Sequence, residues 1–259
     1  MILDENIRLS NGEQMPRLAL GTWFMEGQDV PGAIDQALAL GYRRLDIDAS
    51  FPNLTAIGDA LARQPRRPFL TVKLPGDIAK AANPRATIDQ VLAELHCDQV
   101  DMLMMRRERS WDDTLATWQV LIAALKDKKT SALGVMDFNR AALQELVGAS
   151  LTFPVVNQVV VRIGQTPHDL LAYDRDNEVV TEAYSPVPHG LALKAPVVAK
   201  LATKYGVSII QLCLRYDWQL GLAIWRQTTS PAHMHENAAL DFQISETDME
   251  TLGRLQITE

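Results

Sequence analysis

The sequence predicts a single α/β domain, a (β/α)8 barrel of the TIM-barrel type with an N-terminal β-hairpin and two extra helices. A chain of 259 residues, 47% of them hydrophobic, matches the size of one such barrel, about 250 residues. Short apolar runs alternate with longer segments of helical period, as in a parallel sheet with crossover helices. No repeat or Pro/Gly-rich linker divides the chain, so we expect residues 1–259 to form one domain.

The chain opens with a hairpin signal. In the segment 7–20, IRLSNGEQMPRLAL, the pair Asn11 and Gly12 separates two apolar stretches. An Asn-Gly pair favours the tight turn of a two-stranded hairpin. We expect this hairpin to close the bottom of the barrel.

Eight apolar runs are the candidate barrel strands. They span residues 17–21, 43–47, 69–74, 100–105, 131–135, 154–161, 178–184 and 222–225. Between them, six segments place apolar residues at i, i+3, i+4 and i+7, the period of an amphipathic helix. These segments are residues 33–40, 86–95, 114–126, 140–147, 168–175 and 196–206. We expect each to pack as a helix against the outside of the barrel.

The composition and charge of the chain limit the kinds of partner that we expect. The net charge of -7 and the pI near 5.3 come without a Lys/Arg run, which argues against nucleic acid or an anionic membrane as a partner. No stretch approaches the roughly 18 apolar residues of a membrane span. Cys97 and Cys213 lack CxxC spacing, so we expect no metal site. We expect a cytoplasmic protein, monomeric or weakly oligomeric, that acts on a small molecule.

The candidate site lies at the carboxyl ends of the strands. In (β/α)8 barrels the chemistry sits there, in the loops that lead into the helices. The residues at these positions are Gly21, Thr22, Trp23, Asp46, Asp48, Phe51, Lys73, Arg106, Arg107, Met136, Asp137, Gln158, Tyr184, Ser185, Arg226 and Gln227. Several of them are ionisable, whereas a merely structural barrel would prefer apolar layers.

Eight stretches of the chain carry motifs. They are MPRLALGTW (15–23), GYRRLDIDASFPN (41–53), LTVKL (70–74), DQVDMLMM (98–105), LGVMDFN (133–139), VVNQVVV (155–161), AYSPVP (183–188) and HENAALDFQISETDM (235–249). In order and spacing they resemble the aldo-keto reductase family, over nearly the whole chain. The resemblance implies the barrel fold and an NADPH-dependent reductase.

The resemblance also implies a catalytic tetrad of Asp, Tyr, Lys and His, in which the Tyr protonates the carbonyl oxygen as NADPH delivers hydride. Asp46 and Lys73 fall on the Asp and Lys positions. Phe51 falls on the Tyr position and Arg106 on the His position. A phenyl ring has no exchangeable proton, and losing a positioned acid typically costs about 10²- to 10⁴-fold in rate. We therefore expect ordinary carbonyl reduction to be slow.

Arg106 adds a permanent cation close to the expected place of Lys73. Asp48 shares a strand face with Asp46, because side chains two residues apart on a strand point the same way. We expect Asp48 and Arg106 to pair, which would give a catalytic cluster of Asp46, Asp48, Lys73 and Arg106. Two interpretations stay open: a structural ion-pair network, or a pocket in which Arg106 binds a substrate carboxylate. The residues expected to line the substrate are Trp23, Phe51 and Arg107.

A cofactor site follows from the same resemblance. Tyr184 would stack on the nicotinamide, and Gln158 and Asp137 would bind its carboxamide. Ser185 begins the loop that would bind the pyrophosphate. The full set is Gly21, Thr22, Asp46, Asp137, Gln158, Tyr184, Ser185, Arg226, Gln227, Glu236 and Asn237. Arg226 stands where the family holds the 2'-phosphate, so we expect NADPH, with NADH as the alternative.

Three functions remain in view. The first is an NADP(H)-dependent oxidoreductase with an altered tetrad that reduces an imine or another unusual unsaturated substrate, one option being a carboxylate-bearing molecule. The second is a non-catalytic homologue that serves as a scaffold or regulatory protein. The third is a cofactor-independent lyase or isomerase in which Asp46 or Asp48 abstracts a proton beside Lys73 and Arg106.

Overall fold

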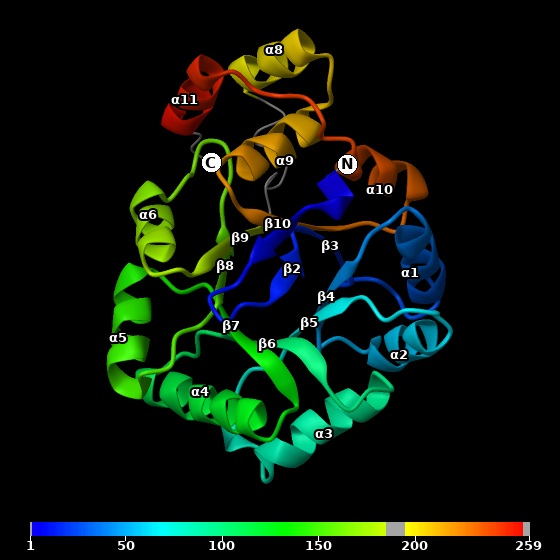
Figure 1. Cartoon of the computed structure of the whole chain (residues 1–259), viewed down its shortest axis with the longest axis vertical. Coiled ribbons are helices and arrows are strands. Elements are labelled where there is room, and N and C mark those ends of the chain that lie inside the picture. Colours follow the sequence, from blue (N-terminus) through cyan, green and yellow to red (C-terminus); the bar gives the residue numbers. More distant parts are fainter. Residues whose placement is uncertain (1, 185–194, 256–259) are drawn as a thin grey trace.

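Eight parallel strands close into a barrel in the computed structural model, which describes residues 2–184 and 195–255 (Figure 1). The strands are β3 (Leu18–Gly21), β4 (Arg44–Asp48), β5 (Phe69–Lys73), β6 (Val100–Arg106), β7 (Thr130–Met136), β8 (Val156–Val160), β9 (Val180–Tyr184) and β10 (Ala223–Gln227). They follow one another in chain order, and β10 pairs with both β9 and β3. The predicted barrel and its eight strands are confirmed.

The N-terminal hairpin lies across the bottom of the barrel. Its strands are β1 (Asn6–Arg8) and β2 (Gln14–Pro16), which pair antiparallel. Gly12 takes a φ of 92° in the connecting turn, a conformation open to glycine but not to most residues. Leu9 and Met15 pack in one apolar cluster with Val156 and Val180, the first residues of β8 and β9. The predicted hairpin is confirmed, and these contacts close the lumen at its lower end.

Ten α-helices lie within the described residues. They are α1 (Val30–Ala39), α2 (Leu54–Ala62), α3 (Pro84–Glu94), α4 (Trp111–Lys126), α5 (Arg140–Ser150), α6 (His168–Asp176), α8 (Pro196–Tyr205), α9 (Ile209–Gln219), α10 (Pro231–Ala238) and α11 (Glu246–Arg254), with short 3-10 turns η1 (Ile2–Asp4) and η2 (Ile78–Lys80). All six predicted segments are helical. Helices α2, α9, α10 and α11 were not among the predicted segments.

One predicted segment packs elsewhere than expected. Residues 196–206 form α8, which packs against α9 and α11 in a separate apolar cluster instead of against the barrel. Lys204 and Tyr205 of α8 also bind Asp248 of α11. The helix that leads into β10 is α9, so α8 and α11 are the two extra helices, side by side in Figure 1.

No helix in the described ranges is by itself long and apolar enough to cross a membrane. Only α8 and α9 taken together reach that length and composition, and they meet at an angle of 86°. Both contribute side chains to the apolar cluster that they share with α11.

Asp174 fastens α6 to the barrel. Its buried carboxylate accepts hydrogen bonds from Thr181 Oγ1 on β9, at 2.8 Å, and from Asn157 Nδ2 on β8, at 3.2 Å. Burial raises the pKa of the Asp174 carboxyl to about 6, although both hydrogen bonds act in the opposite direction. The group therefore favours its protonated form more in the folded chain than in the unfolded one.

Asp174→Asn is expected to remove a pH dependence of stability. The folded carboxyl holds its proton up to a pKa of about 6, against 3.8 for the ordinary group. The contribution of the Asp174 carboxyl to the free energy of unfolding is therefore complete below about pH 4 and is lost as the pH rises through 6. Two pKa units correspond to about 3 kcal/mol. Urea unfolding of wild type and Asp174→Asn between pH 4 and 7 measures the difference in their free energies of unfolding. If that difference did not change with pH, the raised pKa of Asp174 would be contradicted.

Candidate active site

A network of buried polar side chains crosses the lumen of the barrel. Lys73 on β5 forms an ion pair with Asp46 on β4, and Lys73 Nζ also donates to Gln158 Oε1 on β8, at 3.3 Å. Gln158 Nε2 donates to Asp46 Oδ2 and to Glu182 Oε2 on β9, each at 3.0 Å. Glu182 in turn pairs with Arg44 on β4. No member of this lumen network is more than 5% exposed.

The lumen network is electrically balanced. It contains two cations, Arg44 and Lys73, and two carboxylates, Asp46 and Glu182. Burial lowers the pKa of the Arg44 guanidinium to about 10, and the charge of Asp46 acts in the opposite direction, so Arg44 keeps its proton at neutral pH. Because an isolated buried ion costs several kcal/mol, each of the four charges depends on its neighbours.

Trp225 of β10 packs against the lumen network. Lys73 Nζ lies 4.6 Å from the centroid of its ring, and the Tyr184 ring stacks on it at a centroid distance of 6.4 Å and an angle of 17°. A Cβ atom on Gly21 would lie only 2.3 Å from Trp225 Cε3. Gly21 is therefore the residue that makes room for the indole.

Three aromatic rings form an apolar wall after strands β3 and β4. Phe51 meets Phe24 edge to face at a centroid distance of 4.9 Å, and Trp23 at 6.5 Å. Phe24 is 64% exposed and has a φ of 58°, which is uncommon for a bulky residue. Asn53 Nδ2 holds this segment by donating to the carbonyl oxygens of Thr22 and Met25, each at 3.0 Å.

The predicted pair of Asp48 with Arg106 is wrong. Asp48 Oδ1 accepts hydrogen bonds from the backbone N and the Oγ of Ser50. Arg106 Nε instead lies 3.5 Å from Asp137 Oδ2. The physical reason is local, because an Asp side chain readily caps the backbone N–H two residues on. The predicted cluster of four therefore divides: Asp46 and Lys73 lie in the lumen, whereas Asp48 and Arg106 have separate partners outside it.

The side chains of Tyr184 and Asp137 also contact each other. Tyr184 OH donates to Asp137 Oδ1 at 2.6 Å. Burial, and then the hydrogen bond to Asp137, raise the pKa of the Tyr184 phenol above its usual value. A chain of contacts thus runs from Tyr184 through Asp137 to Arg106, across the ends of β9, β7 and β6.

The candidate cofactor residues occupy different environments. Gln158 is wholly buried in the lumen network. Thr22 is buried and its backbone N donates to Asp46 O at 2.9 Å. Burial lowers the pKa of Arg226, whose Nε has no hydrogen-bond partner among the described residues.

Other candidate residues lie farther from the lumen. Gln227 is exposed at the end of β10, and Arg107 is exposed after β6. Glu236 and Asn237 lie on α10. Ser185 lies outside the described residues.

Sequence reasoning missed three members of this site: Arg44, Glu182 and Trp225. The spacing of these residues was a usable signal, because each stands two residues before a candidate at the end of its strand. Arg44 precedes Asp46, Glu182 precedes Tyr184, and Trp225 precedes Gln227. Alternate residues on a strand share a face. The same rule that linked Asp46 with Asp48 would therefore have placed all three in the lumen.

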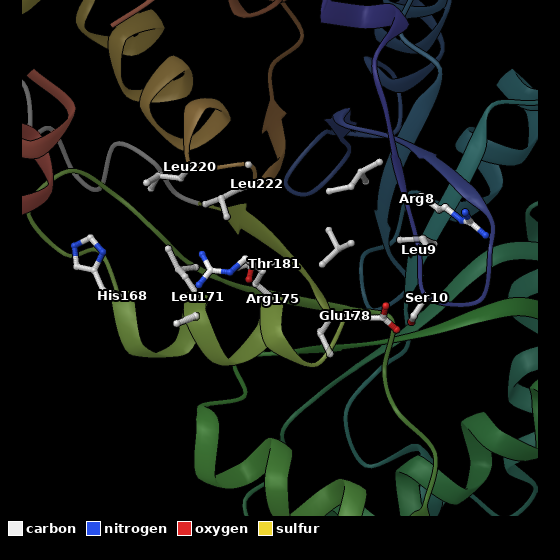
Figure 2. A pocket seen from close by; sticks show the side chains of 15 residues that line it. Arg8, Leu9, Ser10, His168, Leu171, Arg175, Glu178, Thr181, Leu220 and Leu222 are labelled. Carbon is white, nitrogen blue, oxygen red and sulfur yellow. The ribbon is translucent and has the colours of Figure 1, made fainter. Parts of the chain in front are cut away.

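A pocket of about 710 Å³ lies away from this site, between the hairpin, α6 and the start of β10 (Figure 2). Leu171, Leu220 and Leu222 supply apolar lining, and Arg8, Arg175 and Glu178 supply charged groups. No site residue expected from the sequence lines this pocket. It therefore carries no part of the proposed chemistry.

Comparison with known proteins matches the chain to one family along nearly its whole length. The model described as "Aldo/keto reductase family" matches residues 17–257. Methylglyoxal reductase DkgA of Salmonella typhimurium is 30% identical, over 96% of this chain and 92% of that protein. Glyoxal reductase of Bacillus subtilis is 29% identical, over 99% and 95%. An aldo-keto reductase of the silkworm Bombyx mori, solved with NADPH, has a TM-score of 0.87 and 28% identity, over 97% and 88%.

Gly21→Ala is expected to displace Trp225, because the new Cβ would overlap the indole. Overpacking of this kind typically costs about 1–3 kcal/mol of stability. Urea unfolding measures the loss, and tryptophan emission reports the changed environment of the ring. Gly32→Ala is the matched control, because a Cβ on Gly32 in α1 meets no atom within 4 Å. Equal stabilities of the two variants would contradict the proposed role of Gly21.

Proposed function

The chain belongs to the aldo/keto reductase family of NADP(H)-dependent oxidoreductases, and on that premise we propose that it reduces a substrate that needs no proton from residue 51, such as an imine. One observation carries this proposal. The ion pair of Lys73 with Asp46 is intact, whereas the residue at the expected acid position, Phe51, has no exchangeable proton.

An imine fits this arrangement because its nitrogen is basic and takes up a proton from water before reduction. NADPH, when bound, supplies the hydride, which adds to the C=N carbon while the π electrons move to the nitrogen; the products are an amine and NADP⁺. Phe51, Trp23 and Phe24 form the apolar wall, which would exclude water from one side of the reacting bond. The positive charge of Lys73 and the negative charge of Asp46 offset each other in their ion pair.

Arg106 is the residue that we expect to bind a substrate carboxylate. Its side chain is 53% exposed, and its ion contact with Asp137 is 3.5 Å long. Exposed ion pairs of this kind contribute little, about 0–1 kcal/mol, so a ligand carboxylate can compete for the planar guanidinium. Arg107, also exposed, adds a second positive charge beside it.

Tyr184, Asp137 and Arg226 are the proposed cofactor residues. Tyr184 presents a ring that already stacks parallel to Trp225. Arg226 offers a buried Nε that lacks a partner in the described part of the chain, which suits a phosphate group. On this basis we expect NADPH to bind more tightly than NADH.

A scaffold or regulatory role is the second candidate. The exposed rings of Trp23 and Phe24, 37% and 64% exposed, favour it, because adjoining exposed aromatic side chains also occur at protein interfaces. The lyase or isomerase is less well supported. Asp46 accepts from Lys73 and Gln158, and Asp48 accepts from Ser50, so neither carboxylate is a free base.

Titration with NADPH and NADH, followed by quenching of tryptophan fluorescence, tests the proposal first. We expect saturable binding that is tighter for NADPH, followed by turnover of cyclic and amino-acid-derived imines. Within a matched pair of imines, the one with a carboxylate should react faster, and Arg106→Met should remove that difference. Absence of binding at millimolar cofactor would leave the scaffold role; binding without reduction of any imine would refute the proposed substrate class.

Phe51→Tyr is expected to raise the rate of reduction of a small aldehyde by about 10²-fold or more, because it supplies a general acid at the position where the family resemblance implies one. Steady-state rates with NADPH measure the change. Phe153→Tyr is the control, because Phe153 is also partly exposed but lies in the connection between α5 and β8. An unchanged aldehyde rate in Phe51→Tyr would mean that Arg106 or the cofactor site limits the reaction as well.

A further inference from the structure

We infer that Glu182, paired with the buried cation Arg44, is a positioning residue. It fixes the side-chain amide of Gln158 so that the amide oxygen offers a free lone pair to the carboxamide N–H of the nicotinamide cofactor. The inference deepens the proposed function and rests on it in one respect: the chain has to bind a nicotinamide cofactor.

The hydrogen bonds of Gln158 leave one acceptor free. A glutamine amide has two N–H donors and a carbonyl oxygen with two lone pairs. The donors bind Asp46 Oδ2 and Glu182 Oε2, each at 3.0 Å. The oxygen accepts from Lys73 Nζ at 3.3 Å, and from no second donor within residues 2–184 and 195–255. Its other lone pair can therefore accept a ligand N–H while the bond to Lys73 persists.

Two carboxylates decide which end of the Gln158 amide faces them. The last torsion of a glutamine side chain is broad and roughly two-fold, so the amide could in principle turn over. In the turned orientation its oxygen would lie against Asp46 and Glu182, whose ionised oxygens are acceptors only. The carboxylates therefore select the orientation in which the nitrogen faces them and the oxygen faces Lys73.

Glu182 adds a constraint that Asp46 alone would not supply. With a single bond to Asp46, the amide plane could rotate about that bond. The two N–H bonds of an amide diverge within one plane, so a second acceptor on β9 fixes the plane as well. The direction of the free lone pair is then set before a ligand arrives, which is the condition for a preorganised contact.

Arg44 keeps Glu182 an acceptor. The side chains of both residues are 0% exposed, and they form an ion pair. A buried carboxylate without a cation beside it favours its protonated form. A protonated Glu182 could donate a hydrogen bond to the amide oxygen of Gln158, and the turned orientation would then be allowed. The pair acts as a unit for this reason.

Arg44→Met combined with Glu182→Met tests the inference, because it removes the acceptor and its cation together and leaves the charges of Lys73 and Asp46 balanced. Arg254→Met combined with Glu250→Met is the matched control, since these residues form an exposed ion pair on α11. The probes are NADP⁺ and its 3-acetylpyridine analogue, in which a methyl group replaces the amide NH2. Isothermal titration calorimetry gives both dissociation constants.

We expect the buried-pair variant to bind NADP⁺ about fivefold or more weakly than wild type, and to bind the analogue within about twofold of wild type, because only NADP⁺ has the N–H that the fixed oxygen accepts. The control should change neither constant. A general disturbance of the barrel would weaken both nucleotides alike. Equal losses for the two, or an unchanged constant for NADP⁺, would overturn the inference.

Glu182→Gln covers the case in which the buried-pair variant does not fold. It retains the size of residue 182, but its amide can offer either an N–H or an oxygen to Gln158, so the single orientation is lost. We expect the same selective loss of NADP⁺ affinity with a smaller magnitude. The same two outcomes overturn the inference for this variant.

The binding measurement separates this inference from the proposed function, because it needs no substrate. A selective loss in a protein that reduces no imine would refute the substrate class and support the inference. Imine turnover together with equal losses for the two nucleotides would do the reverse. If wild type bound neither nucleotide, both would be overturned.

Discussion

The balance of four buried charges inside the barrel is the constraint on which the rest of the site depends. Lys73, Asp46, Glu182 and Arg44 come from three strands, β4, β5 and β9, and Gln158 joins them from a fourth, β8. None of these charges is stable alone when buried in the lumen. The strands therefore have to meet in register before any one charge is satisfied, and the packing around them, including Gly21 against Trp225, preserves that geometry.

The two ends of the lumen differ in chemistry for this reason. The lower end is filled by Leu9 and Met15 from the hairpin, together with apolar residues that begin the strands. The lumen network reaches from Arg44, the first residue of β4, to Lys73, the last residue of β5. The loops beyond the strand ends carry Trp23, Phe51 and Arg106, at the end of the barrel where active sites of this architecture lie.

The strands were predictable because their apolar runs are short and bounded, whereas some helices were not. In α9, Ile209–Gln219, apolar residues lie on more than one face because it contacts both β10 and α8. The prediction that 196–206 packs against the barrel was wrong because α9, which follows it in the chain, occupies that place. The positions of Asp46 and Lys73 followed from the strand-end rule, but the partner of Asp48 did not. Strand parity gives the direction of a side chain and not the nearest donor, which here is Ser50.

The closed lower end has a consequence for ligand access. Leu9 and Met15 pack against the first residues of β8 and β9, so a ligand that reaches Lys73 has to enter from the end of the barrel at which the strands terminate. A cofactor and a substrate would therefore share one entrance.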